Sequence, residues 1–254
     1  MIRRKPKDSL ILVKVRKLPV AANVCGQVLR EVEKQPTWSM AHVIMNPMAE
    51  SLLHKHREMT EIYVITKGHG EALFDVSKPD DVCRRVVAGS AFDILPGVPH
   101  MLKNIGGGYL EHLVFALPPF NPADVEIIKD ESFVQKSPAQ LFLSEPQDCF
   151  DGAKIISYDF SHLGLSVALG WVTSDLMRRK KPHYHKRTTE FAYVVEGKGF
   201  VNINRTLVPI QSGDWLRVNP GTEHGFVNES PEDLVVVCVC SPAFQMEDVH
   251  YSRR

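Results

Sequence analysis

Short runs of Val, Ile and aromatic residues recur along the chain, and Gly, Pro, Asn and Asp separate them. The clearest runs are residues 41–45, 62–65, 110–116, 167–173, 191–195 and 234–239. β-Branched and aromatic residues favour strands, and many short strands between turn residues are typical of a barrel or sandwich. The pattern therefore predicts an all-β protein.

The chain also repeats itself. Residues 54–68 and 183–197 both fit HxHxxxxExxxxxxG without a gap, at an offset of 129 residues (183 − 54). Residues 96–104 and 220–228 both fit PGxxHxxxN, at an offset of 124 (220 − 96). The second copy is thus five residues shorter between the motifs (129 − 124), where residues 77–81 of the first copy predict a longer hairpin loop.

A repeat of this length indicates two similar domains. We expect an N-terminal domain over residues 1–120, which includes an N-terminal strand, and a C-terminal domain over residues 161–254. The Pro-rich residues 118–122 open a connector that we place at residues 121–160 and expect to contain one short helix.

The first motif of each copy has the residue types of a metal site. Residues two apart on a strand point to the same side, so His54 and His56 share a face. A glutamate on the next strand and a histidine after the PG turn can add two donors, and the Gly that ends the motif tolerates a positive φ in a tight turn. The predicted ligands are His54, His56, Glu61 and His100 in the first copy and His183, His185, Glu190 and His224 in the second.

Three imidazoles and one carboxylate suit transition-metal ions such as Fe, Mn, Ni, Co, Cu or Zn better than Ca or Mg, which prefer oxygen ligands. A lone HxH is weak evidence for metal, since most histidines serve packing or the surface. The complete set occurs twice at matched spacings, and this favours metal binding.

The motif pairs resemble those of the cupin superfamily, and their tandem arrangement resembles a bicupin, over about residues 38–118 and 161–242. Cupins often have a further Pro just before the PG pair or its equivalent, where Leu95 and Asn219 stand here. The resemblance implies two jelly-roll barrels, each with one divalent ion held by the eight residues named above. Fe, Mn or Ni is favoured, and Zn, Co or Cu are alternatives.

Strand alternation also predicts which other side chains face each pocket. The expected pocket or substrate contacts are Tyr63, Asn104, Ala192, Phe226 and Asn228. Because Ala192 stands where the first copy has Tyr63, we expect more space beside Glu190 than beside Glu61. Compensating repacking of equivalent cores is an open alternative. The pattern singles out no catalytic residue.

Composition narrows the partners. Lys+Arg and Asp+Glu are both 30, so the chain lacks the general basic field of a nucleic-acid binder or of a protein attracted to acidic membranes. The basic run at residues 178–181 could draw an anionic substrate to the second site or simply be a solvated loop. Pairing of exposed strand edges would give a homo-oligomer.

Location is predicted from the cysteines and the apolar runs. Five cysteines without a CxxC spacing argue against a disulfide framework and favour a reducing, cytoplasmic compartment. Residues 10–13 form too short an apolar run for a signal peptide, and no run approaches the ~20 residues of a membrane span.

The leading functional hypothesis is a metal-dependent enzyme that acts on a small oxygen-rich or carboxylated molecule. The resemblance favours a dioxygenase slightly. A non-oxidative isomerase or lyase, in which the metal polarises a carbonyl, is the first alternative. A small-molecule binding or storage protein without turnover is the second.

Overall fold

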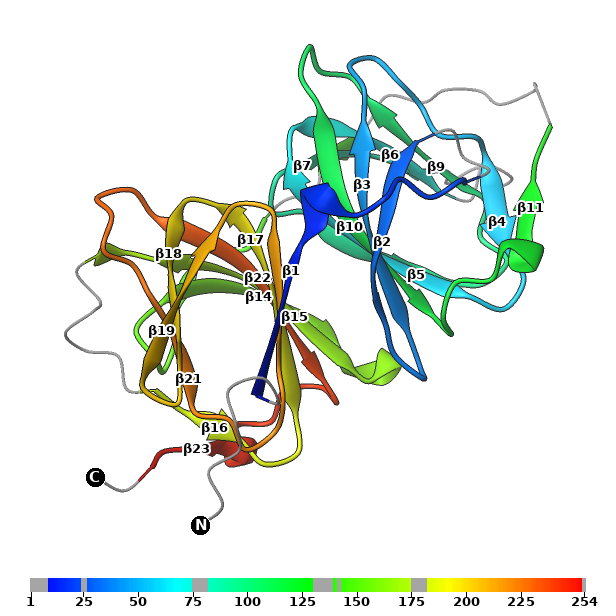
Figure 1. Ribbon diagram of the computed structural model, residues 1–254. Coiled ribbons are helices and arrows are strands. Elements are labelled where there is room, and N and C mark those ends of the chain that lie inside the picture. Colours follow the sequence, from blue (N-terminus) through cyan, green and yellow to red (C-terminus); the bar gives the residue numbers. More distant parts are fainter. Residues whose placement is uncertain are drawn as a thin grey trace. The chain divides into compact units, whose positions relative to one another are not determined.

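The computed structural model describes residues 9–23, 27–74, 82–129, 139–140, 143–174 and 182–252 (Figure 1). It divides into two compact units, residues 17–143 and residues 1–16 with 144–254, which we call the first and second barrels. Both consist of β-strands with short 3-10 helices, which confirms the all-β prediction. The six runs predicted from the sequence all fall on strands, except that Thr173 lies one residue beyond the end of β15.

The first barrel has two sheets. The five-stranded sheet has the order β2 (Val28–Lys34), β3 (Ser39–Met45), β10 (Leu110–Leu117), β5 (Thr60–Lys67) and β8 (Ala91–Ile94). The six-stranded sheet has the order β11 (Val125–Ile127), β4 (His54–His56), β9 (His100–Asn104), β6 (His69–Phe74), β7 (Val82–Val87) and β12 (Ala139–Gln140). The 3-10 helices η1 (Val15–Lys17) and η2 (Pro122–Asp124) lie along the chain before β2 and β11.

The second barrel repeats this plan. Its largest sheet has the order β1 (Leu10–Lys14), β20 (Asp214–Val218), β17 (Thr189–Glu196), β22 (Leu234–Ser241), β15 (Leu165–Val172), β14 (Lys154–Phe160) and β13 (Gln147–Asp148). A three-stranded sheet contains β19 (Thr206–Gln211), β18 (Lys198–Ile203) and β21 (His224–Val227), and β16 (Tyr184–His185) pairs with β23 (Val249–His250). The 3-10 helices are η3 (Ser161–Leu163) and η5 (Met246–Asp248).

Each barrel encloses its own apolar core. In the first barrel Met45, Ile65, Val86, Leu102 and Leu110 are at most 1% exposed and pack in one cluster. The second barrel has a corresponding cluster around Val172, Val194, Leu216, Leu234 and Val236. Burying such a side chain stabilises the fold by about 1.5–3 kcal/mol, so these clusters fix the walls from which the polar motifs project.

The glycine that ends each first motif is required by its backbone. Gly68 and Gly197 have φ of 82° and 84°. A Cβ atom at either position would lie 2.5 Å from a backbone carbonyl oxygen, that of Tyr109 or Asp233. The turn after β5 and β17 therefore admits only glycine without rearrangement, as the sequence predicted.

The domain boundaries differ from those predicted. The strand β1 was expected in the N-terminal domain, but it pairs antiparallel with β20 of the second barrel, from Leu10 opposite Val218 to Lys14 opposite Asp214. Its Lys14 ammonium also lies 2.6 Å from the buried Asp214 carboxylate. The apolar run identified a strand, but local alternation carries no information about which strand it joins.

Residues 121–160 are not a separate connector. The strand β11 pairs with β4 in the first barrel, whereas β13 and β14 belong to the second. The described part of this stretch contains the 3-10 helix η2. Residues 130–138, where more of the expected helix could fall, lie outside the described residues, as do the hairpin loop 77–81 and the basic run 178–181.

Cys83, Cys149, Cys238 and Cys240 are free thiols, and Cys25 lies outside the described residues. Among the residues that the structure describes, no helix has the length and apolar character that crossing a membrane requires.

Candidate metal centres

The first cluster forms where β4, β5 and β9 meet. His54 lies opposite His100 in the sheet, and His56 points to the same side of β4 as His54. Glu61 reaches them from β5, with its Oε2 3.1 Å from His100 Nε2 and 3.3 Å from His56 Nε2. The four predicted ligands are all buried, and their donor atoms lie within 4.8 Å of one another.

The second barrel builds the same cluster from the equivalent elements. His185 belongs to β16, Glu190 to β17 and His224 to β21, and His183 forms a bridge to His224. Glu190 Oε2 lies 3.2 Å from His224 Nε2 and 3.4 Å from His185 Nε2. These donor atoms also fall within 4.8 Å of one another. The structure thus brings together both predicted sets of four.

Backbone carbonyls orient most of these imidazoles. The Nδ1 atoms of His54, His100 and His224 lie 2.8, 3.0 and 2.8 Å from the carbonyl oxygens two residues earlier, and His185 Nδ1 lies 3.2 Å from that of Asp248. A carbonyl only accepts, so Nδ1 must carry a hydrogen, and Nε2 is the nitrogen whose lone pair an ion can take once any proton there has left. That is how a protein prepares a histidine to bind a metal through Nε2.

In each cluster the carboxylate is ionised, and one imidazole beside it, that of His54 or His183, is neutral at pH 7. Burial lowers the pKa of His54 and of His183 to about 4, with help from neighbouring histidines. Burial raises the pKa of Glu61, but the hydrogen bond from His100 and the nearby His56 outweigh it, so the pKa lies well below its usual range. Burial likewise raises the pKa of Glu190, but the charge and hydrogen bond of His224 and the nearby His185 outweigh it.

Both clusters suit one divalent metal ion each. His56 Nε2 and His185 Nε2 are buried and have no hydrogen-bond partner in the part of the chain that the structure describes. A buried nitrogen lone pair without a partner is costly, and an ion among the four donors would satisfy it. The mixed nitrogen and oxygen donor set suits a first-row transition metal.

Two aspartates that sequence reasoning missed shape the loops between the ligands. Asp124 accepts hydrogen bonds from the backbone N–H groups of Arg57, Glu58 and Met59, at 3.0–3.1 Å. Asp248 accepts from the N–H groups of residues 186, 187 and 188, at 3.0–3.2 Å. A signal existed in the sequence, since Phe-x-x-x-Asp-Val occurs at residues 120–125 and 244–249.

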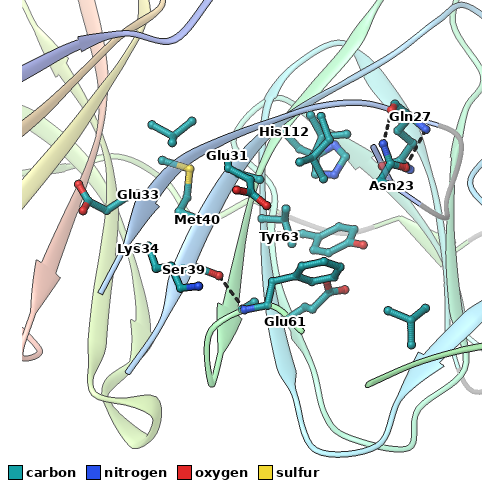
Figure 2. A pocket seen from close by; sticks show the side chains of 18 of the residues that line it. Asn23, Gln27, Glu31, Glu33, Lys34, Ser39, Met40, Glu61, Tyr63 and His112 are labelled. Carbon is teal, nitrogen blue, oxygen red and sulfur yellow. Dashed lines mark hydrogen bonds between the residues drawn. The ribbon is translucent and has the colours of Figure 1, made fainter. Parts of the chain in front are cut away.

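A cavity of about 310 Å³ opens beside the first cluster, and His54, His56 and Glu61 line it (Figure 2). Tyr63 lies in its wall as predicted, and His112 lies there as well. His112 stacks on Tyr63, with ring centroids 4.9 Å apart and planes 24° apart. His112 was not predicted as a pocket residue, although it is a polar residue in an apolar run whose counterpart in the repeat is Val236.

The second cavity is larger, at about 460 Å³, as expected from the exchange of Tyr63 for Ala192. His183, Glu190 and His224 line it, and so does the predicted Phe226. Ala192 belongs to the apolar core cluster and does not itself line the cavity, because its short side chain ends in the packed wall.

Asn104 and Asn228, expected to contact substrate, hold loops instead. Asn104 Nδ2 donates to the carbonyls of Met45, Asn46 and Gly108, and its Oδ1 accepts from Gly106. Asn228 bonds in the same way to residues 172, 232 and 230. Neither lines the cavity beside the cluster of its barrel, because the backbone of the adjoining loops engages both ends of each amide.

Comparison with known proteins defines the class. A family model described as "Cupin" matches residues 29–129, and one described as "Cupin domain" matches residues 177–240, together more than half of the chain. The chain therefore belongs to the cupin family and is a two-domain member, with one cupin domain in each barrel.

Relatives extend the comparison. The protein is 33% identical over 109 residues to "Uncharacterized protein MJ1618" of Methanocaldococcus jannaschii, which covers 41% of this chain and 83% of that protein. The fold of the present protein is similar to that of oxalate decarboxylase of Lactobacillus farciminis. The TM-score is 0.69 at 17% identity, and the match covers 92% of this chain and 87% of that one. Oxalate decarboxylase of Bacillus subtilis gives a TM-score of 0.67, 16% identity and coverage of 92% and 78%.

Proposed function

We propose that this protein is a metal-dependent enzyme that acts on a small oxygen-rich or carboxylated molecule. The observation that carries the proposal is a buried cluster of three histidines and one glutamate that opens onto a cavity in each barrel. An ion held there by Fe-, Mn- or Ni-compatible donors would supply Lewis-acid or redox chemistry to a bound oxygen ligand. Zn, Co and Cu fit the same donors.

The chain's own residues have separate tasks in this proposal. The histidines and glutamate hold the ion, and Asp124 and Asp248 hold the loops between them. The apolar walls exclude water from the reacting groups, which strengthens electrostatic interactions with a charged substrate. A carboxylate substrate would bring its negative charge to the cation.

Dioxygenation is the first reaction class to test, because a redox-active ion in a water-poor cavity suits oxygen chemistry. A non-oxidative lyase or isomerase is the second candidate, and one observation favours it. His112 lines the first cavity, and burial, with a contribution from His42, lowers its pKa to about 3, so its imidazole is neutral and can form a hydrogen bond to a substrate carbonyl or carboxylate. The two solved structures of similar fold are named oxalate decarboxylases, and decarboxylation is a lyase-type reaction of a carboxylated molecule.

The test begins with metal content, measured by inductively coupled plasma mass spectrometry on protein purified without a His tag or added metal. We expect about two equivalents of Fe, Mn or Ni per chain, and His54→Ala and His183→Ala should each remove about one. Protein that contains no metal and takes none up on reconstitution would contradict the proposal.

Substrate screening of the loaded protein then separates the reaction classes. Conversion of a carboxylated substrate only in the presence of O₂ supports the dioxygenase. Conversion that continues in strict anoxia supports the lyase or isomerase, as would a content of zinc alone. Tight binding of small carboxylates without turnover in either condition would indicate a storage or binding protein.

A further inference from the structure

The two cavities have walls of different chemistry at equivalent positions. The strand β10 contributes His112, Val114 and Ala116 to the lining of the first cavity. The equivalent residues of β22, which line the second cavity, are Val236, Cys238 and Cys240. The first wall carries an imidazole stacked on the Tyr63 ring, whereas the second carries small apolar side chains and thiols.

From this difference we propose that the barrels take ligands of different chemical class. The second cavity binds a molecule with a planar apolar body and a metal-chelating pair of oxygens, whereas the first binds a short polar chelator. The inference rests on the proposed function, since it requires an ion in each cluster.

In the first cavity, His112 offers a hydrogen bond to a ligand. The side chain is 1% exposed, and its Nδ1 is buried with no hydrogen-bond partner among the described residues. A buried polar atom in this state costs free energy until a ligand or water satisfies it. Glu31, Ser39 and the hydrogen-bonded pair Asn23 and Gln27 add polar groups to the same lining (Figure 2). A compact polar ligand can hydrogen-bond to His112 Nδ1 and to these groups, whereas an apolar ring would leave His112 Nδ1 unsatisfied.

In the second cavity, two phenyl rings stand beside the metal donors. Phe150 contacts the ring of His183 edge-on, with centroids 5.1 Å apart, and Phe244 contacts His185 in the same way at 6.0 Å. The two phenyl rings are nearly parallel, with centroids 6.2 Å apart and planes 14° apart. Together they present an aromatic surface next to the cluster, on which a planar ligand can pack while its oxygens reach the ion.

Most of the rest of the second lining is apolar, although it includes Asp151, whose carboxylate interacts electrostatically with His183 and His224. Phe226, Val236 and Ile155 line it, and Val236 replaces the imidazole of the first barrel. Burial raises the pKa of the thiols of Cys149, Cys238 and Cys240, so they stay protonated and act as small apolar groups. Asp159, the acidic residue on β14, is exposed at the rim.

Cavity size agrees with this division. The second cavity, at about 460 Å³, exceeds the first, at about 310 Å³. Ligand pockets of about 300–1,000 Å³ hold small organic molecules, so the second has room for a substituted ring beside the ion and the first is at the lower end.

The experiment compares oxalate with 4-nitrocatechol. Both chelate a metal through two oxygens, but oxalate is a short polar dianion, whereas 4-nitrocatechol carries its oxygens on a planar aromatic ring. Isothermal titration is carried out on metal-loaded His54→Ala protein, which keeps only the second site, and on loaded His183→Ala protein, which keeps only the first. We expect 4-nitrocatechol to bind the second site at least about ten-fold more tightly than the first, and oxalate to show the opposite preference.

Two further variants test the wall residues themselves. Val236→His in the His54→Ala background should weaken 4-nitrocatechol binding about ten-fold, and His112→Val in the His183→Ala background should weaken oxalate binding by a similar factor. Circular dichroism and metal content confirm that each variant is folded and loaded, and Phe244→Leu offers a milder change to the aromatic surface should Val236→His not fold.

Binding of both probes to both sites within about threefold, or a preference of 4-nitrocatechol for the first site, would overturn this inference and leave the metal proposal standing. Failure of the unaltered protein to take up metal would overturn both.

Discussion

At the scale of single residues, position and protonation decide what a histidine does. The donor atoms of the three histidines and the glutamate of each cluster lie within 4.8 Å of one another, and carbonyl oxygens accept from most of the Nδ1–H groups. His112 is equally buried, but it has no counterpart in the second barrel, where the equivalent position is a valine, Val236. It is therefore a feature of the first cavity alone.

The low pKa of His112 predicts a pH-dependent stability. Burial lowers this pKa from the ordinary value of 6.5 to about 3. As the pH falls below 6.5, His112 therefore becomes protonated in the unfolded chain but stays neutral in the folded chain. The stability that neutral His112 contributes is present above pH 6.5 and is lost between pH 6.5 and 3. In metal-free protein, His112→Val should lose about 2 kcal/mol less free energy of unfolding between pH 7 and 5 than the unaltered protein.

Urea unfolding at the two pH values measures this difference. His69→Val is the control, since His69 is an exposed histidine of the same barrel. Equal pH dependence of the His112→Val variant and the unaltered protein would show that folding does not lower the pKa of His112.

At the scale of elements, the 3-10 helix that follows β10 or β22 fixes the loop between the two histidines of the HxH motif and the glutamate of the same cluster. Asp124 at the end of η2 accepts three backbone N–H groups, and Asp248 at the end of η5 does the same in the second barrel. Burial raises the pKa of Asp248, but these N–H groups outweigh it and hold the pKa at about 2, so the carboxylate is ionised. The loop keeps its shape because a charged acceptor satisfies all three donors.

We therefore expect Asp124→Ala to weaken metal binding at the first site about 10–100-fold, since residues that orient ligands typically have effects of this size. A competition titration with a chromophoric chelator measures it, in the His183→Ala background so that only the first site contributes. Glu126→Ala is the matched control. Glu126 lies two residues on, and its carboxylate pairs with Arg57 and Lys55 at the surface, so its loss should change affinity by less than about threefold. A folded Asp124→Ala protein with unchanged affinity would contradict the assignment.

At the scale of the whole molecule, the chain does not run through its barrels in simple order. The first described strand completes the largest sheet of the second barrel, and only then does the chain build the first barrel. Leu10 and Leu12 pack against the second core cluster, whereas Ile11 between them is 38% exposed. The second barrel therefore depends on residues more than a hundred positions before the rest of it.

This topology predicts that Leu12→Asp destabilises the second barrel. Placing a carboxylate against an apolar core should lower its free energy of unfolding by about 2–3 kcal/mol, whereas Ile11→Asp, on the outer face of the same strand, should change it by less than about 1 kcal/mol. Urea unfolding is followed by the fluorescence of Trp171 and Trp215 in a Trp38→Phe background, because both lie in the second barrel. A loss of equal size in both variants would contradict the observed face of β1.

Much of the site was predictable because its information is local. Two histidines two apart on a strand share a face in any sheet, a glycine seven residues after a glutamate marks a tight turn, and the duplication shows which spacings matter. These local rules were sufficient to name all eight residues of the two clusters and the strands that carry them.

What the sequence by itself determined was therefore the all-β class, the duplication and the two donor sets. Only the tertiary structure decided that β1 joins the second barrel, that Asn104 and Asn228 hold loops, that Asp124 and Asp248 cap the ligand loops, and that His112 lines a cavity. Alternation along a strand sets which face a side chain takes but not its neighbour across the sheet, and each of these features depends on contacts between residues distant in the chain.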